Sequence, residues 1–65
     1  MNMRVVQIIA EAIRKLGRIP SGHLYAQVMG ALTLDQYQGV IGTLERSGVI
    51  EVKNHELIWK GGNVS

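Results

Sequence analysis

Side chains that could carry acid–base or metal chemistry are few in this chain and lie far apart. His23 and His55 fall in separate predicted elements, and the chain has no cysteine to complete a metal site with either. The acidic residues are scattered, and Gly61-Gly62 lacks the helix and lysine that follow a phosphate-binding loop. A fold of this size also offers no deep pocket. We therefore expect no enzyme activity, cofactor, metal or small-molecule substrate.

A second group of side chains, between residues 33 and 55, is of the kind that reads DNA. Glutamine pairs with adenine edges, arginine with guanine or phosphate, and threonine with either type of base. Lys53 and its two neighbours form a predicted turn tip that either touches DNA or is a plain solvated turn. The candidate DNA contacts are Thr33, Gln36, Gln38, Gly39, Gly42, Thr43, Arg46, Lys53, Asn54 and His55.

Gly39 and Gly42 are unusual because they lie inside a predicted helix, where each glycine costs about 1 kcal/mol relative to alanine. On the exposed side they leave a shallow trough, which a DNA backbone, a protein helix or a peptide could approach closely. Two other interpretations stay open. The positions could merely tolerate glycine, or the glycines could permit tight packing against the rest of the domain.

Two helices precede this region. The spacing of apolar residues predicts a helix over 3–16 with one buried face, ended by Gly17. That face consists of Val6, Ile9, Ala10, Ile13 and Leu16. Val5, Ile8 and Ala12 widen the apolar arc, so either the domain wraps this helix or they form a homodimer interface. Residues 18–20 predict an extended link, and Ser21 is the predicted N-cap of a helix over 22–29.

The rest of the chain predicts one helix followed by a β-hairpin. Thr33 and Gln36 match a capping box, so a helix should begin there and run to about residue 47, with Gly48 after it. Residues 49–53 and 56–60 alternate as strands around an Asn54-His55 turn. The register should place Val52 opposite Leu57 and Ile50 opposite Trp59. We expect Trp59 to fill the core.

Within this order, Ala26 and Gly30 have the spacing of the small residue and turn glycine of a helix-turn-helix. In the helix predicted after Thr33, the buried apolar positions begin one residue later than in a compact helix-turn-helix. This implies that the turn between the two helices is one residue longer. The chain resembles winged helix-turn-helix domains, which are mainly α with a small β-hairpin (α+β). The resemblance spans residues 1–60 and leaves a disordered tail over 61–65. It implies a DNA-binding regulator similar to small phage, prophage or bacterial proteins.

The low positive charge of the chain weakens the DNA-binding hypothesis. Net charge is only +2; residues 1–32 carry four basic and one acidic side chain, whereas residues 33–65 carry three basic and four acidic. Most non-specific DNA affinity comes from basic side chains on phosphates. The predicted recognition helix has little positive charge. Attraction to the DNA phosphates must therefore come from other basic residues or from a second copy of the chain. The other basic residues considered are Arg14, Lys15, Arg18, Lys53 and Lys60.

Two function classes therefore remain. The first is a DNA-binding winged helix acting as a homodimer. The second is a winged helix that binds a protein on the exposed face of its third helix and does not bind DNA. Basic residues gathered on one face would favour the first, and basic residues spread over several faces the second. A cysteine-free chain without an apolar run of membrane-spanning length or a signal-peptide pattern is expected in the cytoplasm.

Overall fold

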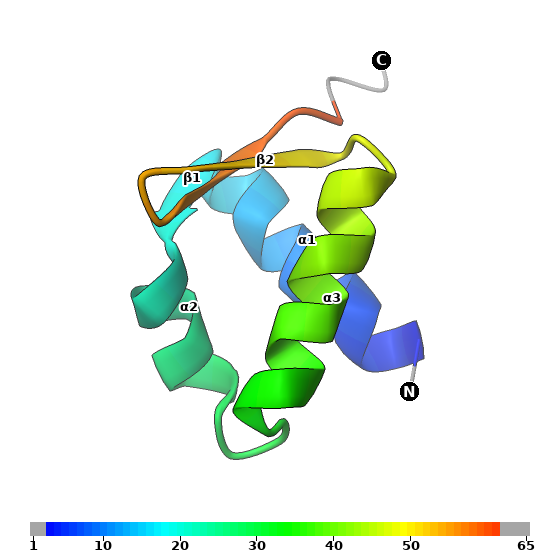
Figure 1. Cartoon of the computed structure of the whole chain (residues 1–65), viewed down its shortest axis with the longest axis vertical. Helices are drawn as coiled ribbons and strands as arrows, with labels where there is room; N and C mark the ends of the chain where they lie inside the picture. Colours follow the sequence, from blue (N-terminus) through cyan, green and yellow to red (C-terminus); the bar gives the residue numbers. More distant parts are fainter. Residues whose placement is uncertain (1–2, 62–65) are drawn as a thin grey trace.

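Three helices and one antiparallel sheet make up residues 3–61, the part of the chain that the computed structural model describes (Figure 1). The elements are α1 (Met3–Leu16), β1 (Arg18–Pro20), α2 (Ser21–Val28), α3 (Leu34–Arg46), β2 (Ile50–Lys53) and β3 (Glu56–Trp59). The mixed α+β class expected from the sequence is confirmed. Apart from Gly61, the predicted tail lies outside the described residues.

Helix α1 has the predicted bounds, and its apolar periodicity buries Ile9 and Ile13 completely. Gly17, at φ +80°, ends the helix, and its amide donates a 2.8 Å hydrogen bond to the Ile13 carbonyl. The assignment of Leu16 to the buried face was wrong, since its side chain is 62% exposed. Leu16 lies in the last turn, where the chain leaves the helix axis, so no neighbouring element covers it.

The start of α2 differs from the expectation. Ser21 does not cap the helix; Pro20 is the N-cap residue, and no side chain caps the turn. The Tyr37 hydroxyl instead donates to the Ser21 carbonyl at 3.0 Å and lies 3.2 Å from the Ser21 hydroxyl. Because the tyrosine proton goes to the carbonyl, the serine hydroxyl donates to Tyr37. Ser21 therefore ties α2 to α3.

Helix α3 begins with the predicted capping box. The Gln36 amide donates to the Thr33 hydroxyl at 3.2 Å, and the Thr33 amide donates to the Gln36 side-chain oxygen at 3.0 Å. The helix ends at Arg46, one residue before the expected end. Gly48 follows at φ +83°, a conformation that glycine adopts without steric cost.

Strand β3 lies in the middle of the sheet, whose order is β1-β3-β2. The predicted hairpin register is confirmed, with Ile50 opposite Trp59 and Val52 opposite Leu57. The short strand β1 pairs with the other edge of β3. Asn54 and His55 both have positive φ, at 53° and 63°, as a type I′ hairpin turn requires.

The core lies between the helices and the inner face of the sheet. The hairpin contributes Leu57 and Ile50, whereas Trp59 is only half-buried at the edge of the core. The prediction that Trp59 fills the core was therefore wrong. The buried residues are Ile9, Ile13, Ile19, Leu24, Leu32, Tyr37, Val40, Ile41, Leu44, Ile50 and Leu57. Among the described residues, no helix has the length and apolar character to cross a membrane.

Removing the capping hydroxyl should destabilise the protein measurably. Thr33→Ala leaves the Gln36 amide without its partner, and we expect a loss of about 1 kcal/mol in the free energy of unfolding. In a domain of this size such a loss lowers Tm by about 4–8 °C. The matched control is Thr43→Ala, because the Thr43 hydroxyl only donates within the helix, to the Gly39 carbonyl. Urea and thermal denaturation measure both; equal losses would contradict the capping role.

Alkaline pH should destabilise the protein through Tyr37. Burial raises the pKa of this phenol above its ordinary value, although the hydrogen bond with Ser21 lowers it in smaller part. The unfolded chain then releases the proton first, so stability is intact below about pH 10 and falls as pH rises above it. Urea denaturation from pH 8 to pH 11 should show a flatter decline for Tyr37→Phe. A decline in Tyr37→Phe as steep as that of the wild type would contradict this origin of the pH dependence.

Candidate functional site

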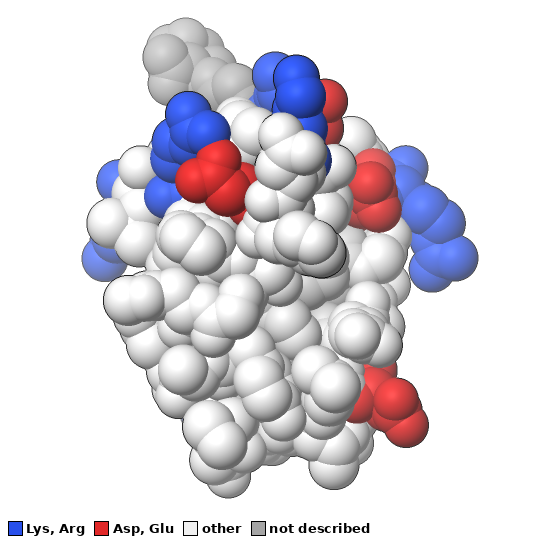
Figure 2. All heavy atoms as spheres, turned by 60° about the vertical axis from the view of Figure 1, so that its left-hand side comes forward, with Lys and Arg blue, Asp and Glu red and all other residues white. Residues whose placement is uncertain are grey.

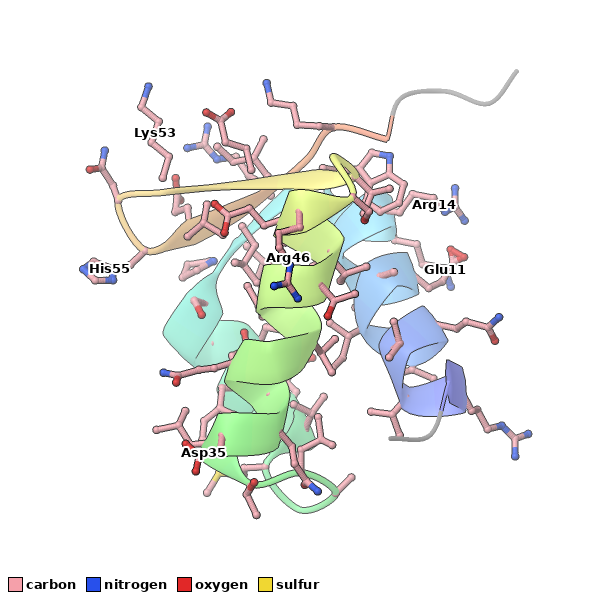
Figure 3. The ribbon with its side chains drawn as sticks, turned by 45° about the vertical axis from the view of Figure 1, so that its right-hand side comes forward. Glu11, Arg14, Asp35, Arg46, Lys53 and His55 are labelled. Atoms are coloured by element: carbon pink, nitrogen blue, oxygen red, sulfur yellow. The ribbon has the colours of Figure 1, made fainter. Side chains whose placement is uncertain are left out.

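The outer face of α3 is exposed and carries mainly uncharged polar groups. Asp35 and Arg46 project near its opposite ends (Figure 3). Between them lie Gln38, Gly39 and Thr43, all exposed. Tyr37, Val40, Ile41 and Leu44 occupy the opposite side and are buried. The amphipathic spacing of the sequence therefore leaves the predicted DNA-reading positions open to solvent.

The fold itself uses some of these side chains. Thr33 and Gln36 form the capping box, and the Thr43 hydroxyl donates to the Gly39 carbonyl at 2.9 Å. Gln38 and Arg46 make no hydrogen bond or ion pair within the described part of the chain. Their side-chain groups, like the carboxylates of Asp35 and Glu45, are therefore available to a ligand without the loss of an internal contact.

Gly42 has space around it. A Cβ atom added at this position would meet no heavy atom within 4 Å outside the helix backbone and the adjacent residues. The interpretation that Gly42 permits tight internal packing was therefore wrong. A docking surface and simple tolerance remain as explanations. Gly42 itself is half-buried.

The hairpin tip is exposed but held in place. Lys53, Asn54 and His55 are all exposed, and Lys53 has no ion-pair partner among residues 3–61. The Ser21 amide donates a 2.8 Å hydrogen bond to the His55 carbonyl. This bond fixes the tip beside the start of α2. No sequence pattern indicates this bond, because it joins two backbone groups far apart in the chain.

Acidic neighbours neutralise several of the predicted phosphate contacts. Arg14 donates to Glu11 at 2.6 and 2.9 Å, and this hydrogen bonding lowers the pKa of the Glu11 carboxyl below its ordinary value. Arg18 donates to Glu56 across the β1–β3 pair. Lys60 lies 3.4 Å from Glu51. These pairs are exposed and compete with water, so a phosphate could still displace the acid. Each pair nevertheless reduces the net attraction for DNA.

The basic residues gather at one end of the molecule rather than on one face. Six of the seven, all except Arg4, lie near the sheet: in the last turn of α1, in β1, at the end of α3, and in or just after the hairpin. They point in different directions, as Arg14, Arg46 and Lys53 show in Figure 3. Their spread over several sides is the distribution expected of a protein-binding module.

A long uncharged surface lies at the other end. From residue 19 to residue 44 the only acidic or basic side chain is Asp35, a signal that was already present in the sequence. In Figure 2 the charged side chains lie mainly around the upper part, and most of the surface below them carries none. Met29 and Leu34, on either side of the α2–α3 turn, are 59% and 50% exposed. Sequence reasoning did not select these two residues.

The predicted dimer residues on α1 separate into two groups. Val5 and Ala12 are half-buried and pack against the protein's own core, whereas Ile8 is 57% exposed. The interpretation that the domain wraps this helix holds for Val5 and Ala12, whereas Ile8 is left uncovered, and the homodimer interface stays a prediction. Among the described residues, no cluster of histidine, aspartate and glutamate could hold a metal ion.

The comparisons with known proteins do not place the chain in a family. No protein-family model, no curated protein and no solved structure matches it.

Proposed function

We propose that this chain is a winged helix-turn-helix protein that binds duplex DNA, with α3 in the major groove and the β2–β3 hairpin as the wing on the DNA backbone. The element order and the sheet order β1-β3-β2 support the winged arrangement, because they place a hairpin directly after the third helix. On this proposal the protein acts as a regulator, similar to the small phage, prophage or bacterial proteins that its sequence resembles.

The observation that carries the proposal is the chemistry of the outer face of α3. Gln38 and Arg46 offer unengaged hydrogen-bonding groups: glutamine pairs with adenine edges, and arginine contacts guanine or phosphate. No large apolar side chain is exposed on this helix beyond Leu34, in its first turn. A polar face without exposed apolar residues suits base-edge readout better than it suits the core of a protein interface.

Electrostatics limit the affinity of one copy. Arg46 and Lys53 are the cations on α3 and the hairpin that have no ion-pair partner among the described residues, and Asp35 and Glu45 on α3 oppose them. Two phosphate contacts give a slope of about −1.8 in log Kobs against log salt, far below that of strongly basic repressors. Binding by a single copy is therefore weak. A homodimer would double the number of contacts on one duplex.

A second candidate function is favoured by two observations. The first is the spread of the basic residues over several sides of the described structure, and the second is a surface almost without charge. The uncharged surface from residue 19 to residue 44, with Met29 and Leu34 exposed at the α2–α3 turn, has the low charge and the methionine content of a protein-interface core. On this alternative the protein binds an apolar segment of another protein and not DNA. The DNA titration below distinguishes the two.

Fluorescence-anisotropy titration of mixed-sequence duplex DNA, at about 50 mM salt, tests the DNA proposal directly. We expect binding at or below tens of micromolar protein. Arg46→Gln and Lys53→Gln should each make the salt slope about 1 unit shallower, because each removes one phosphate contact. Arg14→Gln is the control, since its guanidinium on α1 is paired with Glu11, and its slope should match the wild type. A wild type that leaves the anisotropy unchanged across this range would exclude DNA binding and favour the second candidate.

Variants at Gly42 separate docking from tolerance. Gly42→Ala should raise the free energy of unfolding by about 0.5–1 kcal/mol, because alanine favours the helix and its Cβ meets no neighbour. Gly42→Leu should remain folded but weaken DNA binding by about tenfold or more, because its side chain fills the trough. Urea denaturation and the same anisotropy titration measure the two effects. Wild-type affinity in Gly42→Leu would show that the glycine is tolerated and not used.

A further inference from the structure

An open groove of about 550 Å³ runs along the outer side of α1, on the face that Ile8 leaves uncovered. Its walls include Arg4, Gln7, Ile8, Glu11, Arg14 and Trp59. The groove thus combines an exposed isoleucine and a half-buried tryptophan with charges of both signs. It belongs to a different element from the outer face of α3.

We propose that a second copy of this chain occupies the groove, with the two α1 helices packed antiparallel about a twofold axis between Gln7 and Ile8. In a twofold interface each contact occurs twice, because the same surface is used on both copies. This axis places Arg4 of one copy opposite Glu11 of the other. By symmetry, Glu11 of the first copy lies opposite Arg4 of the second. Opposite charges therefore meet at both ends of the helix contact.

The charge pattern favours this register, because it pairs Arg4 with Glu11 at both ends of the contact. An axis through Glu11 would bring two carboxylates together, and an axis through Ile9 would place Arg4 opposite Arg14. Like charges directly opposed across an interface are unfavourable. In the proposed register Glu11 lies between Arg14 of its own helix, to which it is already hydrogen-bonded, and Arg4 of the second copy.

Apolar contact supports the same axis. Ile8, 57% exposed, lies beside the twofold axis, opposite Gln7 of the second copy and next to that copy's own Ile8. Trp59 borders the groove and offers further apolar surface. Val5 and Ala12 pack inward, so Ile8 and Trp59 replace them as the apolar part of the interface. Leu16 is equally exposed, at 62%, but lies beyond the overlap of the two helices in this register.

The contact is small, and the dimer should therefore be weak. A stable interface buries about 800 Å² on each partner, which would be a large part of the 4518 Å² surface of this chain. One helix face and a tryptophan edge supply less than that. We expect a dissociation constant of tens to hundreds of micromolar, and an increase in that constant with salt because of the ion pairs. The proposal is independent of DNA binding: a dimer that ignores DNA contradicts only the proposed function.

Sedimentation equilibrium of the wild type from about 5 μM to about 1 mM measures the association. Ile8→Lys should raise the dissociation constant by about tenfold or more, because it places charge at the centre of the interface. The matched control is Leu16→Lys, an equally exposed residue on the same helix, which should associate as the wild type does. A wild type that stays monomeric to 1 mM overturns the proposal, and so does a Leu16→Lys effect as large as that of Ile8→Lys.

A charge exchange tests the register. Arg4→Glu places a second acid opposite Glu11 at both ends of the contact and should weaken the dimer by about tenfold. Adding Glu11→Arg restores opposite charges, so the double variant should return to within about threefold of the wild type. Circular dichroism verifies that each variant is folded, which we expect because the Glu11–Arg14 pair is exposed. A double variant no stronger than Arg4→Glu alone would overturn the proposed register.

Discussion

Pairing of the central strand β3 with both of its neighbours is the constraint on which the rest of this structure depends. Leu57, fully buried in that strand, packs into the core, while the strand's two edges hold β1 and β2. Trp59 donates its amide to the Gly17 carbonyl, and Ser21 donates to His55. The strand thereby fixes both ends of the link between α1 and α2. Without this strand pairing, the hairpin tip and the start of α2 would not be held in fixed positions relative to each other.

A division of charge follows from this arrangement. The sheet and the ends of α1 and α3 next to it hold nearly all of the basic residues, because the strands and helix ends bring together segments that are separate in the sequence. The α2–α3 end is almost uncharged. On the proposed function, phosphates would be contacted from the sheet end and bases by the polar face of α3. Low charge would then make binding depend on hydrogen bonds and on two copies rather than on attraction alone.

Local signals explain what could be predicted from the sequence. The spacing of Ile9 and Ile13, the Thr33–Gln36 capping box and the Asn54-His55 turn each act within a few residues, so they predicted helix bounds and hairpin register well. Tertiary placement explains the failures. The partner of Ser21 is a tyrosine on another helix, and the exposure of Trp59 depends on how the sheet meets α1. Ion pairs such as Arg18–Glu56 likewise need the strand pairing, which the sequence does not state.

Titration of the ¹⁵N-labelled protein with duplex DNA, followed by amide chemical shifts, tests the proposed recognition surface most directly. The shifts should change over residues 38–46 and 53–55, on α3 and the hairpin tip. Shift changes absent at saturating DNA, or confined to α1 or to the α2–α3 turn around residues 29–34, would contradict that surface.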